Sequence, residues 1–166
     1  MSSILVAYAT RYGSTHEAAE AVAAVLSQAG LPADTQNLGE VTDLTGRTGV
    51  VIGAPLFMGA WHKDAHEFLR RHADELATIP VAVFALGPTA DPHDPEEWAT
   101  SRAQLDKALG RHPSLRPVAV GLFGGRYDPA HVETPWTTEA GAVPATDIRD
   151  GAKVTAWARE VAELLR

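Results

Sequence analysis

The chain has 166 residues, 45% of them hydrophobic and 21% charged, which is enough for one globular domain with its own core over residues 1–166. Its formal net charge of −7 argues against nonspecific nucleic-acid binding, because that function needs a basic face. The absence of cysteine excludes disulfides, thiolate nucleophiles and cysteine-ligated zinc or iron–sulfur sites, so any redox chemistry must belong to a bound cofactor.

The first predicted elements are a buried strand at residues 4–9 and an alanine-rich helix at residues 15–29. A hydroxyl-rich turn joins them. Helix N-termini offer unpaired N–H groups and partial positive charge, so this turn predicts a phosphate site. It contains one glycine, and no lysine precedes Lys63, which favours a terminal phosphate over a nucleoside triphosphate or a dinucleotide. A plain polar turn, with Ser14 or Thr15 capping the helix, is the structural alternative.

Four further strands are predicted at residues 33–38, 48–54, 80–86 and 117–123, and three further helices at 62–76, 98–109 and 150–165. The strands are apolar on both faces and alternate with helices. This predicts an α/β fold: a doubly wound, five-stranded parallel sheet with helices on both faces. Residues 124–149 show no clear period, and Trp98 and Trp157 are expected in the helix-packing core. In such a sheet the ligand lies beyond the carboxyl ends of the strands, at the switch in strand order.

Two of the loops at those ends favour a flat ring as the bound group. The loop at residues 55–61 gathers Phe57, Met58 and Trp61, whose exposure is unfavourable unless they cover a ligand; covering the core alone is the alternative. The loop at residues 87–95 is stiffened by prolines and could form the opposite wall, with backbone hydrogen bonds to the ring. Its alternative is a solvated lead-in to the next helix.

Two other groups of side chains are candidates for chemistry. His62 and His66 lie one helical turn apart, but without a zinc motif we expect no metal site. His62 could still move a proton at a bound ring, because imidazole titrates near neutral pH. Arg126 and Tyr127 follow two glycines and could contact a substrate, with a surface turn as the alternative.

These features resemble the flavodoxin-like FMN-binding domains and, more narrowly, the menaquinone-dependent protoporphyrinogen IX dehydrogenases. The resemblance is carried by residues 9–15, 51–54, 59–62 and 67–73. It implies FMN as the cofactor, with its phosphate in the first loop and its ring between the other two. The residues implied are Thr10, Arg11, Tyr12, Gly13, Ser14 and Thr15 at the phosphate, Pro55, Leu56, Phe57, Met58, Gly59, Ala60 and Trp61 along the ring, and Gly87, Pro88 and Thr89 at its other edge.

Two features of the sequence bear on the branch of this family. Arg11 departs from ordinary flavodoxins, whose phosphate site is usually uncharged, and favours the dehydrogenase branch. The dehydrogenases, however, carry a basic and apolar insertion after the fifth strand, whereas residues 128–150 here are acidic. That composition favours neither an interfacial helix nor attraction to anionic lipid.

Three functional hypotheses follow. The first is an FMN-dependent oxidoreductase that passes electrons from a reduced substrate to a quinone or another small-molecule acceptor, which would place it in haem biosynthesis if the substrate is a porphyrin. The second is a flavodoxin-type electron carrier with a basic redox protein as partner. The third is a non-enzymatic domain that has lost the flavin. The sequence predicts a cytoplasmic protein without a membrane segment, and a homodimer is compatible with it.

Overall fold

The computed structural model describes residues 2–10, 13–127 and 145–166. Its elements alternate between strand and helix over most of the chain. In chain order they are β1 (Ser3–Tyr8), α1 (Ser14–Gln28), β2 (Ala33–Asn37), the 3-10 turn η1 (Leu38–Glu40), β3 (Arg47–Phe57), β4 (Ala60–Trp61), α2 (Lys63–Arg71), α3 (Ala73–Leu76), β5 (Val81–Leu86), α4 (Pro95–Leu109), β6 (Ala119–Phe123), β7 (Arg126–Tyr127), β8 (Thr146–Asp147) and α5 (Gly151–Leu164).

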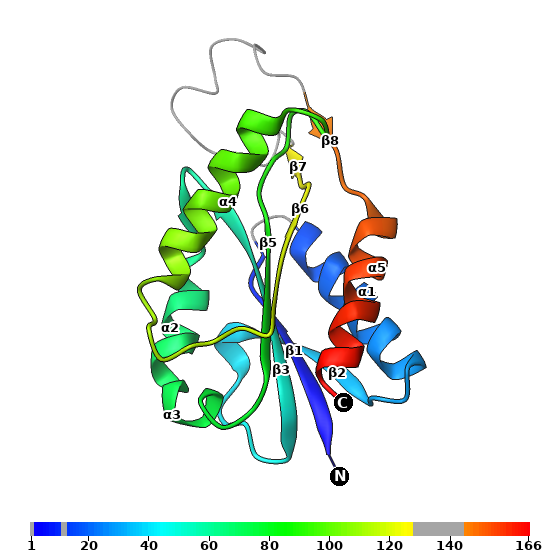
Figure 1. The fold of residues 1–166 in the computed structure, drawn as a ribbon, viewed down its shortest axis with the longest axis vertical. Helices are drawn as coiled ribbons and strands as arrows, with labels where there is room; N and C mark the ends of the chain where they lie inside the picture. Colours follow the sequence, from blue (N-terminus) through cyan, green and yellow to red (C-terminus); the bar gives the residue numbers. More distant parts are fainter. Residues whose placement is uncertain (1, 11–12, 128–144) are drawn as a thin grey trace.

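The main sheet has the strand order β2-β1-β3-β5-β6, and every neighbouring pair along this path is parallel (Figure 1). The order reverses beside β1, because β2 lies on one side of it and β3 on the other. The predicted doubly wound α/β fold is therefore confirmed. The reversal places the switch point, where ligands of such sheets bind, between the carboxyl ends of β1 and β3.

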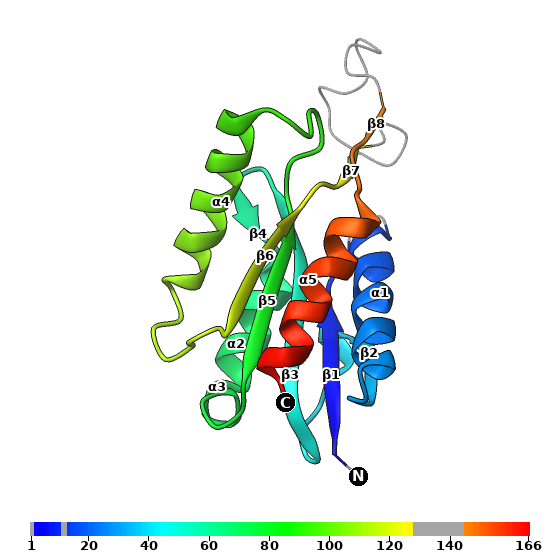
Figure 2. The ribbon, with the colours of Figure 1, turned by 45° about the vertical axis from the view of Figure 1, so that its right-hand side comes forward.

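The strands β1, β3, β5 and β6 contribute alternate residues to two apolar clusters. On β1, Leu5 and Ala7 pack in the cluster that includes α2, α3 and α4, whereas Ile4 and Val6 pack in the cluster that includes α1 and α5. All four side chains are at most 1% exposed. Figure 2 shows the two helix layers on opposite sides of the sheet. Burial on both faces is the reason that these strands appear in the sequence as continuous apolar runs.

The strand predicted at residues 48–54 continues further than expected and turns back as a hairpin. β3 ends at Phe57, which pairs with Ala60 of the antiparallel strand β4. Met58 and Gly59 form the two-residue turn with φ angles of 50° and 82°, and a type I′ turn requires positive φ at both positions. The expected open loop at residues 55–61 is therefore largely a hairpin, in which pairing satisfies the backbone polar groups.

Helix boundaries also differ from the predicted ones. The helix expected at residues 62–76 is divided into α2 and α3 at His72, whose φ of −108° is not helical. Helix α4 begins at Pro95 rather than at residue 98, because Asp94 Oδ1 accepts hydrogen bonds from the N–H groups of Glu96 and Glu97. Among the helices within the described ranges, none combines the length and apolar character needed to cross a bilayer.

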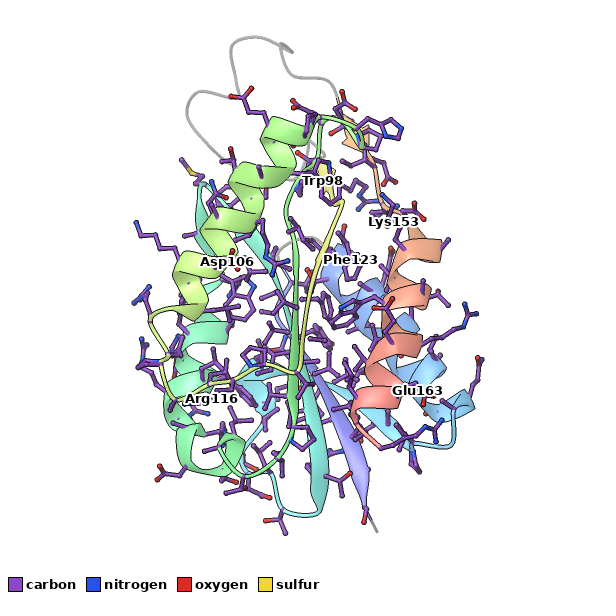
Figure 3. All side chains as sticks on the ribbon, in the orientation of Figure 1. Trp98, Asp106, Arg116, Phe123, Lys153 and Glu163 are labelled. Atoms are coloured by element: carbon purple, nitrogen blue, oxygen red, sulfur yellow. The ribbon has the colours of Figure 1, made fainter. Side chains whose placement is uncertain are left out.

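The two tryptophans expected in the helix-packing core have different environments. Trp157 packs as predicted, with its ring 5.8 Å from that of Phe84 and 5.6 Å from that of Phe123. Trp98 does not. It is partly exposed, and its Nε1 donates to the carbonyl oxygen of Asp91 at 3.0 Å. The reason is its place in the first turn of α4, at the end of the sheet rather than against its middle (Figure 3).

A short antiparallel pair, β7 with β8, lies in the region where the sequence shows no period. From β8 the backbone passes directly over Gly124, where an added Cβ would lie 2.4 Å from the carbonyl oxygen of Ile148. The Ile148 N–H donates to the carbonyl oxygen of Gly125 at 3.1 Å. We refer to residues 146–149 as the strap. Only glycine at position 124 permits this close approach of two backbones.

Candidate functional site

The turn after β1 leaves the N-terminus of α1 open at the switch point of the sheet. Thr10 Oγ1 accepts a hydrogen bond from the Gly13 N–H at 2.7 Å, which closes the turn, and the hydroxyl keeps its own proton for donation. Gly13 is the N-cap residue of α1, with a φ of 91° that glycine adopts without a Cβ penalty. No side chain of the described residues caps this helix, and first-turn N–H groups without such a cap can bind an anion. The expected contacts of Arg11 and Tyr12 lie outside the described residues.

A cavity of about 470 Å³ opens beside this helix end, between the first turns of α1 and α5. Ser14 lies at its border, and Ala18, Leu86 and Val154 contribute apolar surface. Thr15 is only 1% exposed and does not border the cavity. Of the two hydroxyl residues of α1 that are expected at the phosphate, Ser14 is therefore the more accessible one.

The strap places an arginine over this cavity. Arg149 Nη2 lies 2.6 Å from Asp147 Oδ2 and its Nε lies 2.9 Å from Asp147 Oδ1, and its Nη1 forms an ion pair with Glu17 of α1. Hydrogen bonding to Arg149 lowers the pKa of Asp147 to about 2, and the same contact raises the pKa of Arg149 above its ordinary value. Arg149 thus ties the strap to the helix that carries the candidate phosphate turn.

The sequence pattern did not single out Arg149 or Asp147. Their segment shows no period, and no short motif marks them. The signal that could have found them is positional. The stretch between the last strand and the last helix opens at the carboxyl end of a parallel sheet, where ligand-binding residues gather.

The apolar residues of the second loop separate into buried and exposed members. Trp61 is 3% exposed, packs in the core, and donates from Nε1 to the carbonyl oxygen of Ala54 at 3.0 Å. This geometry corresponds to the core-covering alternative rather than to a surface for a ring. Met58 at the hairpin turn is 75% exposed. Phe57, like the two preceding residues of β3, is half-buried, whereas Gly59 and Ala60 are exposed. The surface that the hairpin offers to a ring therefore comes from residues 55–60.

The backbone N–H groups of the third loop already donate within the protein. Thr89 N and Ala90 N donate to Glu97 Oε1 at 3.1 and 3.4 Å. Gly87 N donates to the last carbonyl oxygen of β6 at 3.0 Å, and Pro88 has no N–H. The expected backbone donation to a ring from this loop would require the Glu97 carboxylate to move away. Without such a movement, the third loop can offer a ring its carbonyl oxygens and the Thr89 hydroxyl.

His62 is the N-cap residue of α2. Its Nδ1 accepts a hydrogen bond from the Asp64 N–H at 3.1 Å, so in the neutral ring the proton is on Nε2. His62 directly follows the hairpin, and its own N–H donates to the Pro55 carbonyl oxygen at 3.1 Å. The imidazole is therefore held at the base of the second loop, with Nε2 as the nitrogen that can donate.

His66 is paired with another histidine, His112, and not with His62. It is 6% exposed, and its Nδ1 lies 2.8 Å from Nε2 of His112, which is 8% exposed. Burial, with the positive charges of Arg111, His112 and Arg70, lowers the pKa of His66 to about 4. The two histidines one helical turn apart thus have separate partners, and the buried pair joins α2 to the segment after α4.

The residues expected to contact a substrate, Arg126 and Tyr127, form β7. Arg126 is half-buried and pairs through its backbone with Asp147, and its charge contributes to the low pKa of that carboxyl. A substrate role for the pair stays a prediction. Their position at the base of the strap was not foreseen, because two-residue strands leave no periodic signal.

Comparison with known proteins defines the class to which this fold and site belong. Residues 5–134 match the family described as the flavodoxin domain, and the chain belongs to that family. Among curated proteins it is similar to the protoporphyrinogen IX dehydrogenase [quinone] of Escherichia coli K12, with 28% identity over 128 residues, covering 74% of this chain and 71% of the relative.

Solved structures show the same fold. The reduced flavodoxin of Megasphaera elsdenii superposes with a TM-score of 0.59 at 13% identity, covering 96% of this chain and 98% of that one. A variant of the flavodoxin of Pseudomonas aeruginosa has a TM-score of 0.58 at 21% identity, covering 99% of both chains. The resemblance to flavodoxins is therefore confirmed for the fold and the family.

Proposed function

We propose that this protein binds FMN at the carboxyl end of its sheet and acts as a flavin-dependent oxidoreductase. One observation carries the proposal: in a chain of the flavodoxin domain family, the N-terminus of α1 lies uncapped by side chains of the described residues, behind the Thr10–Gly13 hydrogen bond. First-turn N–H groups and the helix dipole fit a phosphate there. FMN, when bound, accepts and releases one or two electrons at its ring system.

The chain's own residues would hold the cofactor in two parts. The Thr10 and Ser14 hydroxyls and the first-turn N–H groups of α1 would bind the phosphate. The hairpin at residues 55–60 and the loop at residues 87–89 would exclude water from the two sides of the ring. His62 would hold a proton on Nε2 at the base of the hairpin. Arg11 and Tyr12 remain proposed phosphate contacts on the resemblance alone.

Titration with FMN and with riboflavin tests the phosphate site, because riboflavin has the same ring without the phosphate. We expect the purified protein to show flavin absorbance, and the flavin-free protein to bind FMN at least about tenfold more tightly than riboflavin, a difference of about 1.4 kcal/mol. Equal affinity for the two ligands would contradict a phosphate site at α1.

A pair of glycine variants distinguishes an effect on the phosphate site from an effect on the stability of α1. Gly13 and Gly30 have φ angles of 91° and 87° at opposite ends of this helix, and apart from the adjacent residues no atom of the described chain would lie within 4 Å of a Cβ added at either position. Alanine at either position carries a similar strain of about 1 to 2 kcal/mol. We expect Gly13→Ala to weaken FMN but not riboflavin, and Gly30→Ala to leave the binding of both unchanged. Equal losses in the two variants would indicate a stability effect only.

The reaction is proposed by similarity to the E. coli dehydrogenase named above. We infer that a reduced substrate, with protoporphyrinogen IX as the first to test, gives electrons to the flavin and that a quinone takes them. Steady-state oxidation of protoporphyrinogen IX with a soluble quinone tests this directly. A flavodoxin-type electron carrier is the second candidate, favoured by the net charge of −7, which suits a basic partner. FMN binding without turnover would favour the carrier.

The role of His62 can be separated from its capping role. Asparagine caps helices well, so His62→Asn retains the cap of α2 and removes only the imidazole, whereas His62→Ala removes both. If His62 moves a proton, both variants lose turnover and the pH profile changes in both. Full turnover in His62→Asn would assign the residue to capping alone.

A further inference from the structure

A second cavity, of about 370 Å³, lies on the other side of the strap. Helices α4 and α5 cover opposite faces of the sheet (Figure 2), and residues of both line the cavity at the end of the edge strand β6. Trp98 of α4, Phe123 of β6 and Lys153 of α5 line the cavity (Figure 3). The strap lies between this cavity and the cavity beside the candidate phosphate turn, and Gly124, Asp147, Arg149 and Asp150 border both.

The aromatic wall of this cavity is held in place. Trp98 Nε1 donates to the Asp91 carbonyl oxygen at 3.0 Å, which fixes the plane of the indole. The ring remains partly exposed rather than packed into the core. Lys153 Nζ lies 5.5 Å from the ring centroid, within the range of a cation–π contact. A rigid, accessible indole beside an ammonium group is suited to a flat ring that carries a negative charge.

The charges around the cavity leave Lys153 as the one cation there without a carboxylate partner among the described residues. Asp147 and Arg149 pair with each other. Asp150 Oδ1 accepts hydrogen bonds from the Ala152 and Lys153 N–H groups, and this carboxylate is used as the cap of α5. Lys153 Nζ instead contacts the Trp98 ring. An anion entering here would meet an ammonium group that forms no salt bridge with the described part of the chain.

The strand order separates this cavity from the proposed flavin site. The switch point lies between β1 and β3, whereas the cavity lies at β6, which is separated from β3 by β5. Neighbouring strands are about 4.8 Å apart, so the two positions differ by roughly 12 Å along the edge of the sheet. Residues 10–15, 55–61 and 87–89, which are expected at the FMN phosphate and ring, do not line the cavity, whereas Pro92 and His93 from the far end of the third loop do.

We propose that this cavity binds a flat aromatic carboxylate, with its ring against Trp98 and its carboxylate paired with Lys153. The proposal does not rest on the flavin function. Naphthalene-2-carboxylate serves as the probe, and naphthalene-2-carboxamide has the same shape without the charge. Calorimetric titration of the full chain, with and without saturating FMN, measures both affinities.

The variants have distinct expected effects. Lys153→Met should weaken the carboxylate about five- to tenfold and leave the carboxamide unchanged, since it removes only the charge. Trp98→Ala should weaken the binding of both probes about tenfold or more. Trp98→Phe keeps an aromatic ring and should restore most of the affinity, so it tests the proposal even if the alanine variant misfolds. Lys107→Met, on the last turn of α4, is the matched control and should change nothing.

Three results would overturn the proposal. The first is no binding of the carboxylate at millimolar concentration, and the second is equal affinity for both probes in the unmodified protein. The third is binding that saturating FMN abolishes, because it would place the probe in the flavin's own site. Failure of FMN to bind would leave the probe titration intact, so the two proposals can fail separately.

Discussion

At the scale of single residues, the apolar side chains in the loops are where sequence and structure differ most. Trp61 and Met58 both appear in the sequence as large apolar residues in a loop, yet one is 3% and the other 75% exposed. The difference arises from the hairpin. Trp61 pairs with Leu56 and its ring packs in the core, whereas Met58 occupies the turn itself. Residue type alone does not predict the exposure of these side chains, because exposure depends on strand register.

Gly53 provides a prediction at the same scale. It lies on β3 beneath the ring of Phe84, and an added Cβ would lie 2.0 Å from Phe84 Cζ. Phe84 is fully buried and cannot move away without disturbing the core. We expect Gly53→Ala to lower the free energy of unfolding by about 2 to 3 kcal/mol, measured by urea denaturation.

Gly151 is the matched control for this substitution. It occupies the first turn of α5, and a Cβ there would meet no atom within 4 Å. Gly151→Ala should therefore be neutral or slightly stabilising, because alanine favours the helix more than glycine does. A Gly53→Ala protein as stable as the Gly151→Ala protein would show that the core around Phe84 yields easily.

At the scale of elements, the turn between β3 and β4 carries strain that can be measured. Met58 adopts a φ of 50°, which asparagine and glycine tolerate better than methionine. We expect Met58→Asn to raise the free energy of unfolding by about 0.5 to 1 kcal/mol in urea denaturation. Met58→Leu, which keeps both the strain and the apolar surface, should leave stability unchanged.

FMN affinity in the same two variants tests why an unfavourable residue occupies the turn. If Met58 covers the flavin ring, the asparagine protein gains stability and loses FMN affinity, whereas the leucine protein keeps both. An asparagine protein that is more stable and binds FMN equally well would show that the exposed methionine takes no part in the site.

The long elements could be predicted from the sequence, and the short ones could not. The five parallel strands and the covering helices follow from apolar runs and helical periodicity, which burial on both faces imposes. The hairpin, the break at His72 and the β7–β8 pair depend on local pairing and capping within two or three residues. The position of the turn between β1 and α1 was predictable because a strand, a glycine and a helix start lie in sequence order, and its binding of phosphate stays a prediction. The strap was not, because Arg149 meets Glu17 across 132 positions.

At the scale of the whole molecule, the two layers of helices are held to the sheet by different contacts. The α1–α5 layer packs through small apolar residues and aromatic rings. The α2–α4 layer also contains the buried pair His66 and His112, which lie 2.8 Å apart. Only one proton can lie between these two nitrogens, so the two rings cannot both be protonated while this hydrogen bond remains. The stability of this layer should therefore depend on pH in a range where the rest of the core does not.

The sign of that dependence follows from the pKa values. Burial and the charges of Arg111 and Arg70 lower the pKa of both histidines, that of His66 to about 4, whereas an unfolded histidine titrates near 6.5. Between these values the unfolded chain binds more protons, so stability is complete above about pH 6.5 and falls as the pH falls toward 4. At pH 4.5, we expect the lowered pKa of His66 alone to reduce the free energy of unfolding by about 2 to 3 kcal/mol relative to neutral pH.

Urea denaturation between pH 7.5 and 4.5 measures this loss. The double variant His66→Gln, His112→Gln keeps a hydrogen-bonded pair that cannot be protonated, so its stability should change less over this interval than that of the unmodified protein. His93→Gln removes an exposed histidine and should keep the original pH dependence. If the double variant loses as much stability as the unmodified protein on acidification, the acid sensitivity originates elsewhere. Because both rings lie between α2 and the end of α4, the expected loss would appear first as opening of that layer, detectable by hydrogen exchange in α2 before exchange in α1.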